Sequence, residues 1–177
     1  MQEIRLHGRG GQGLVKASHI VVRTAVETGH YGQFIPFFGV ERKGSPVFGF
    51  LRLSEEEIRR KTQVYEPDVL IILDDTLVHL PATYAGLKEG GTVVINSVHD
   101  AAALKMPAQA GKVAIVDATG ICMEELGRNI PNTAMLGAFA RVTGLVDKDR
   151  LFDNIAAEFG ENNRRAAMRA YDAVQVM

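Results

Sequence analysis

The sequence contains a single cysteine, Cys122, and this scarcity limits the chemistry that the chain can carry. One thiol cannot build a disulfide framework, and it cannot by itself hold an iron-sulfur cluster, which usually needs several thiolates. Any redox metal is therefore expected on another polypeptide. Cys122 lies between Ile121 and Met123, which predicts an inert thiol on a helix that faces apolar neighbours.

The sequence also lacks an excess of charge of one sign and any long apolar run. It has 20 basic and 21 acidic residues, whereas a binder of nucleic acid or of an anionic membrane would show a basic excess. No apolar run approaches the roughly 18 residues of a membrane span, and residues Met1–Arg5 lack the apolar core of a signal peptide. We therefore expect no nucleic-acid partner, no membrane association and a cytoplasmic location.

Motifs for catalysis and for metal binding are missing as well. None of the five histidines has a metal-ligand spacing such as H-E-x-x-H. No serine stands in a G-x-S-x-G elbow, so a hydrolase triad is unsupported. We expect no catalytic residue and no metal ligand in this chain, which is better explained as a ligand-binding part of an enzyme than as a complete one.

The apolar pattern predicts an α/β fold with an open, mostly parallel sheet and helices on both faces, a Rossmann-like three-layer sandwich. Val69–Leu73 is an unbroken apolar run of the kind that forms a strand buried on both faces. Residues 1–177 show no linker or repeat, which indicates a single domain. Further strands are expected at residues 4–7, 31–37, 47–53, 92–95 and 113–116, and helices at 13–27, 118–126, 132–144, 147–159 and 161–176.

Polar residues at the starts of several of these segments predict helix caps. Asp117, Asn132 and Asp147 each precede a helical pattern. Ser54 and Glu57 form a capping box, which predicts a short helical turn after the strand at 47–53. Residues 77–87, interrupted by Pro81, predict a broken helix.

The most informative stretch is a glycine-rich turn between the first strand and the first helix. Such a turn lets the backbone approach a ligand and leaves the first N–H groups of the helix without intrahelical partners. With the positive end of the helix dipole it can hold a phosphate or diphosphate, and an arginine within it adds positive charge. The alternative is that the glycines only permit tight packing of strand on helix. The turn is Gly8-Arg9-Gly10-Gly11-Gln12-Gly13.

Ordinary nucleotide binding by this turn is disfavoured. The turn satisfies G-x-G-x-x-G, but the dinucleotide fingerprint also needs an acidic residue about 20 residues further on, and the corresponding stretch around residues 33–36 has no carboxylate before Glu41. The phosphate-loop motif fails because Leu14-Val15 replace the lysine and hydroxyl residue that follow its last glycine.

Residues 29–46 combine aromatic side chains with a charged, glycine-bounded loop. One interpretation makes 31–37 a core strand that leads into a solvated hairpin. The other places Phe37 and Phe38 on a partner surface, because clustered exposed aromatics mark interaction sites, with Glu41 and Arg42 directed at a ligand or another subunit.

Four ordered motifs spanning nearly the whole chain resemble the gamma subunit of 2-oxoacid:ferredoxin oxidoreductases. The phenylalanine-containing form of the second motif is more similar to the pyruvate and 2-ketoisovalerate enzymes than to the 2-oxoglutarate enzymes. The motifs are the glycine turn, Phe37-Phe38-Gly39-Val40-Glu41-Arg42-Lys43-Gly44-Ser45-Pro46-Val47, Tyr65-Glu66-Pro67-Asp68 and Asn132-Thr133-Ala134-Met135-Leu136-Gly137-Ala138.

The resemblance implies a complex that decarboxylates a 2-oxoacid on thiamine diphosphate, reduces ferredoxin through iron-sulfur clusters and releases an acyl-coenzyme A. It implies partners in alpha, beta and delta (ferredoxin-like) subunits, which carry thiamine diphosphate and the clusters. This chain would bind no cofactor tightly, would contact coenzyme A within the complex, and could form a homodimer when isolated. The candidate cofactor-binding residues are Gly8, Arg9, Gly10, Gly11, Gln12, Gly13, Glu41, Arg42, Gly44 and Asn132.

Two other functions stay open from the residues alone, a nucleotide-binding regulator that acts by itself and a small nicotinamide reductase. The sequence leaves undetermined which 2-oxoacid is used, the direction of turnover and the stoichiometry of assembly. It also leaves open whether the glycine turn meets coenzyme A phosphates or only braces the catalytic subunit.

Overall fold

The computed structural model describes residues 1–37 and 44–177. Within these residues the strands form one 7-stranded sheet in the order β2-β3-β1-β4-β5-β6-β7. The central strands β1, β4, β5 and β6 run parallel, which confirms the prediction of an open α/β sheet. The strands are β1 (Gln2–Arg9), β2 (Tyr31–Phe37), β3 (Pro46–Ser54), β4 (Val69–Ile72), β5 (Gly91–Asn96), β6 (Ala110–Val116) and β7 (Gln175–Val176).

The outer strands are antiparallel. β2 pairs with β3, β3 pairs with β1, and β7 pairs with β6 at the opposite edge. The connection between β2 and β3 is too short for the crossover that a parallel pair needs, so the two strands form a hairpin. The strand interpretation of residues 31–37 is confirmed, although β2 is an edge strand with exposed ends and not a core strand.

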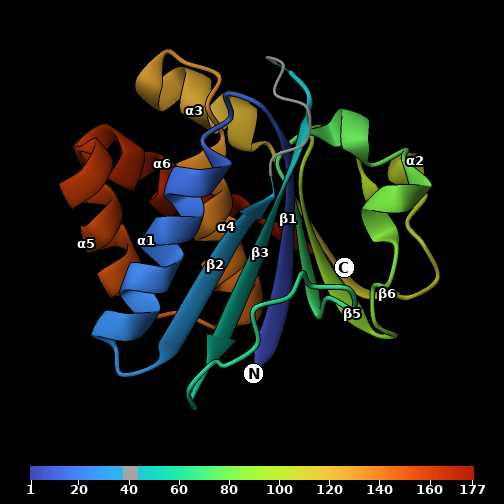
Figure 1. The fold of residues 1–177 in the computed structure, drawn as a ribbon. Helices are drawn as coiled ribbons and strands as arrows, with labels where there is room; N and C mark the ends of the chain where they lie inside the picture. The colour runs from blue at the N-terminus through green and yellow to red at the C-terminus, as the bar shows by residue number, and fades with distance from the viewer. Residues whose placement is uncertain (38–43) are drawn as a thin grey trace.

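The two faces of the sheet carry helical layers of very different thickness (Figure 1). Helices α1, α3, α4, α5 and α6 cover one face and enclose the larger apolar core. Among residues 1–37 and 44–177, the other face, with the smaller core, is covered by short elements only. The helices are α1 (Leu14–Glu27), α2 (Ala101–Leu104), α3 (Ala118–Leu126), α4 (Asn132–Thr143), α5 (Lys148–Phe159) and α6 (Glu161–Ala173), with 3₁₀ turns η1 (Asp75–Leu77) and η2 (Pro81–Tyr84).

The segment 77–87 therefore folds as 3₁₀ turns where the sequence pattern predicted a broken α-helix. Pro81 begins η2, and Gly86 follows with φ of 74°. Pro81 cannot donate a main-chain hydrogen bond, and the left-handed backbone at Gly86 ends the helical path, so no longer helix can form here.

The prediction of a short helical turn from Ser54 and Glu57 was wrong. Ser54 ends β3, and its Oγ accepts a hydrogen bond from the N–H of Glu56, two residues on. The chain beyond Ser54 is irregular. Arg52 donates to the carbonyl oxygens of Thr62 and Gln63, and these bonds hold the far end of the segment against the sheet.

Two further boundaries differ from the predictions. Asn132 is the first residue of α4 and Pro131 is its cap, because the Pro131 carbonyl oxygen accepts the hydrogen bond from Met135 N that begins the helix. Residues 175–176 form β7 where a helix was predicted, because the exposed edge of β6 offers main-chain partners: Val113 and Met177 bond each other in both directions. Asp117 and Asp147 cap their helices as predicted.

β1 carries a row of buried polar side chains on the face of the smaller core. The row consists of Glu3, Arg5 and His7, at alternate positions along the strand. Arg5 Nε donates to His7 Nε2 at 3.0 Å, and its guanidinium also donates to the carbonyl oxygens of Thr83 and Ala85. These bonds fix the region of η2 onto the sheet.

Burial, and then the neighbouring charge of Arg5, lowers the pKa of His7 from 6.5 to about 3. The unfolded chain therefore takes up a proton at His7 as the pH falls below 6.5, while the folded chain does not, so stability falls between pH 6.5 and pH 3. At pH 5 this loss amounts to about 2 kcal/mol. Urea unfolding at pH 7.5, 6 and 5 should show that His7→Gln loses less stability on acidification than the parent chain. Exposed His99 supplies the control as His99→Gln, and identical pH slopes for all three proteins would contradict the prediction.

Among the described residues, no helix is long and apolar enough to cross a bilayer.

Candidate functional site

The glycine turn lies between β1 and α1, at the edge where the parallel strands end (Figure 1). Gly11 and Gly13 have φ of 95° and 74°, left-handed values that other residues adopt only with strain. Ligands of open α/β sheets bind at this edge. The turn predicted from the sequence is therefore built as expected and stands where a ligand site belongs.

Only part of the turn's main chain is available to an anion. Gly10 N donates to Ser45 O at 3.0 Å, and Gln12 N donates to Arg9 O at 3.2 Å. The first N–H groups of α1 have no partner within the helix, and the helix dipole favours negative charge beside them. Any anion held here is therefore expected to meet the start of α1 and not the whole turn.

Arg9 is held in place by a set of contacts. Its Nε and Nη2 donate to Thr76 Oγ1 at 3.1 and 2.7 Å, and its Nη1 donates to Gly44 O at 3.0 Å. Asp74 Oδ2 lies 3.5 Å from Nε, with the Arg9 side chain 32% exposed. The positive charge of Arg9 is thus accessible to solvent but partly neutralised by the Asp74 carboxylate.

The Gln12 side chain forms one hydrogen bond within the turn and one to Asp74, just past the end of β4. Its Oε1 accepts from the N–H of Arg9 at 2.8 Å, and its Nε2 donates to Asp74 Oδ2 at 2.9 Å. Asp74 and Thr76 were not among the candidate residues. The signal for Asp74 was its position just past the buried strand β4. Asn96, the last residue of the neighbouring strand β5, lies close by and donates to Leu73 O at 2.9 Å.

Asn132 reaches the turn from the start of α4. It is 4% exposed, and its Nδ2 donates to Gly13 O at 3.3 Å. The structure thus brings together two predicted candidates that are far apart in the sequence. Gly44 is the other distant candidate that reaches the turn, through its carbonyl oxygen. Glu41, Arg42 and Phe38 lie outside the described residues.

Gly13→Ala is expected to destabilise the chain by about 2–3 kcal/mol. The left-handed backbone costs about 1–2 kcal/mol for any L side chain, and the added Cβ would collide with the Asn132 amide, which adds overpacking. Gly11→Ala is the matched control, because Gly11 also has positive φ but its Cβ would meet nothing within 4 Å. Equal losses in urea unfolding would show that the Asn132 contact does not constrain the turn.

Phe37 is 41% exposed on edge strand β2. Its ring lies 6.3 Å from the rings of both Phe48 and Phe50, measured between centroids. Phe37 is therefore partly packed and partly open to a partner, and its role in a partner surface stays a prediction.

Cys122 is fully buried on α3, as predicted. Burial raises the pKa of its thiol to about 11. Since the thiolate is the reactive form, the thiol is inert in the folded chain.

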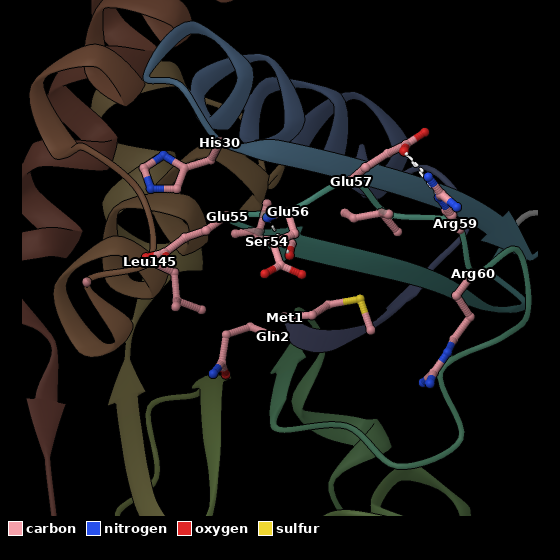
Figure 2. Close-up of a pocket in the computed structure, with 13 residues that line it drawn as sticks. Met1, Gln2, His30, Ser54, Glu55, Glu56, Glu57, Arg59, Arg60 and Leu145 are labelled. Carbon is pink, nitrogen blue, oxygen red and sulfur yellow. Dashed lines mark hydrogen bonds and ion pairs between the residues drawn. The ribbon is translucent and has the colours of Figure 1, made fainter.

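A cavity of about 700 Å³ lies at the other end of the sheet. Figure 2 shows it between Met1 and Gln2 of the β1 end and the segment that carries Glu57 and Arg59, which are paired at 3.0 Å. Gln2 and Arg9 are opposite ends of one strand. A ligand at the glycine turn therefore does not occupy this cavity.

The fold and the site define an α/β chain with a glycine turn at the carboxyl edge of its parallel strands. Residues 3–173 match the pyruvate ferredoxin/flavodoxin oxidoreductase family, and the chain belongs to this family.

The chain is similar along its whole length to gamma-type subunits of these enzymes. It is 48% identical to pyruvate synthase subunit PorC of Methanothermobacter marburgensis, over 99% of this chain and 98% of the relative. It is 47% identical to the pyruvate/ketoisovalerate oxidoreductases common subunit gamma of Thermococcus kodakarensis, with the same coverage. The crystal structure of pyruvate oxidoreductase subunit PORC from Thermotoga maritima matches with a TM-score of 0.88 and 38% identity, covering 99% of this chain and 97% of that one. The resemblance stated from the motifs is confirmed.

Proposed function

We propose that this chain is the gamma subunit of a cytoplasmic 2-oxoacid:ferredoxin oxidoreductase that converts pyruvate or a branched-chain 2-oxoacid, coenzyme A and oxidised ferredoxin into acyl-coenzyme A, carbon dioxide and reduced ferredoxin. The observation that carries the proposal is the similarity to PorC and common gamma subunits over nearly the full length of both chains. Thiamine diphosphate and the iron-sulfur clusters then belong to alpha, beta and delta subunits.

The part played by this chain is to shape the coenzyme A side of the active site. Coenzyme A carries a diphosphate, and the glycine turn supplies the start of a helix with an adjacent arginine that is still 32% exposed. Glu41 and Arg42 order the interface with the catalytic subunit, and Phe37 contributes its exposed face to the same contact. The purified chain alone is expected to be colourless and inactive, which separates this function from that of a nicotinamide reductase.

Arg9→Ala is expected to weaken coenzyme A binding by the assembled complex about tenfold, because one charge-assisted hydrogen bond to a phosphate is lost. Calorimetric titration of coenzyme A into the reconstituted complex measures the effect. Arg59→Ala is the control, since Arg59 is 85% exposed at the far end of the sheet. An affinity unchanged by Arg9→Ala would remove the phosphate role of the turn.

A further inference from the structure

The carboxylate of Asp74 is surrounded by hydrogen-bond donors. Oδ2 accepts from Gln12 Nε2 at 2.9 Å and lies 3.5 Å from Arg9 Nε. Oδ1 accepts from the main-chain N–H of Thr76 at 3.0 Å and from the Thr76 hydroxyl. Only a carboxylate accepts through both of its oxygens, because the side chain of asparagine has one accepting oxygen and one donating NH₂ group.

Gln12 and Thr76, which are both bonded to Asp74, in turn bond Arg9 in the glycine turn. Gln12, oriented by Asp74, accepts the N–H of Arg9 at 2.8 Å. Thr76 gives its hydroxyl proton to Asp74, so its oxygen is left to accept from the Arg9 guanidinium at 2.7 and 3.1 Å. One carboxylate at the end of β4 thus orients both the main chain and the side chain of Arg9.

We propose that Asp74 is a positioning residue for coenzyme A, which sets the geometry of the glycine turn without touching the ligand. The proposal rests on the proposed function of the turn. A purely electrostatic role and a positioning role for Asp74 predict opposite changes in coenzyme A affinity when its charge is removed. A carboxylate near a phosphate repels it, so removing the charge would strengthen binding if charge alone mattered. If Asp74 acts through geometry, removing the charge weakens binding, because an amide at this position turns a donor toward Gln12.

The test is the steady-state kinetics of the reconstituted complex with Asp74→Asn. We expect the KM for coenzyme A to rise about five- to tenfold, the equivalent of one lost hydrogen bond, with kcat at saturating coenzyme A unchanged. Asp75→Asn removes the same charge one residue further on. In the described part of the chain the Asp75 side chain makes no hydrogen bond or ion pair with the turn, so the KM of this variant should not rise. Thr76→Val removes the hydroxyl that joins Asp74 to the Arg9 guanidinium and leaves the bond from the Thr76 N–H to Asp74 in place; it should raise KM about threefold.

The outcomes distinguish this inference from the function on which it rests. A rise in KM with Arg9→Ala but not with Asp74→Asn overturns the role of Asp74 and leaves the coenzyme A site standing. A lower KM in Asp74→Asn, or a fall in kcat alone, overturns it as well. If Arg9→Ala, Asp74→Asn and Thr76→Val all leave KM unchanged, the coenzyme A role of the turn has failed. Where the Asp74→Asn complex does not assemble, Thr76→Val decides, and an unchanged KM in that variant overturns the inference.

Discussion

Arg52→Met is expected to lower the free energy of unfolding by about 3–5 kcal/mol, the typical result of breaking a buried ion pair by removing one partner. The Arg52 side chain is fully buried and lies 2.9 Å from Glu3 Oε1. Its guanidinium also donates to Gln33 Oε1 and to the carbonyl oxygens of Thr62 and Gln63. Methionine fills a similar volume, so the loss reports on the polar partners left behind and not on a cavity.

Arg59→Met is the matched control for this experiment. Arg59 pairs with Glu57, but the two side chains are 85% and 63% exposed, and such surface pairs contribute little. Urea unfolding should show a change within about 0.5 kcal/mol for Arg59→Met. A loss in Arg52→Met no greater than that of the control would show that the buried network contributes nothing to stability.

Gly137→Ala should destabilise the chain by about 3 kcal/mol or more, at the upper end of the cost of overpacking. Gly137 lies inside α4 where this helix packs on α6. A Cβ at this position would collide with the carbonyl oxygen of Ala167 and would lie 2.7 Å from its carbonyl carbon. Since these atoms belong to the backbone of α6, no side-chain rotation can relieve the clash and the two helices must separate.

Gly144→Ala, at the end of the same helix, separates crowding from backbone strain. Gly144 has φ of 62°, but an added Cβ would meet nothing within 4 Å, so only the left-handed backbone is penalised, by about 1–2 kcal/mol. Thermal unfolding of both variants measures the difference. Equal losses would mean that the close approach of α4 and α6 does not depend on Gly137.

Local pattern was enough to find most strands and helices. The run Val69–Leu73 and the alternation of Val47–Leu53 depend only on neighbours along the chain, and both segments are strands in the structure. The charged segment after Ser54 was mispredicted because local signals competed there with bonds from Arg52, a residue whose burial no local pattern indicates.

The candidate site could be predicted in part for a similar reason. Glycines at fixed spacing between a strand and a helix mark a turn whatever surrounds it, and the turn was found. Asp74 and Thr76 were missed as site residues because their importance comes from contacts with Arg9 and Gln12, more than 60 residues away. Asn132 and Gly13 likewise come into contact only when α4 has packed beside α1.

The sequence by itself determined the class of fold, the glycine turn at the end of the first strand and the family, because each of these depends on the spacing of nearby residues or on the order of motifs along the chain. Only the tertiary structure decided which carboxylate orients Arg9, which N–H groups of the turn are already bonded, and which arginines are buried. These features depend on residues from distant segments that meet only in the folded sheet, and the free energy of such contacts exists only in the packed chain.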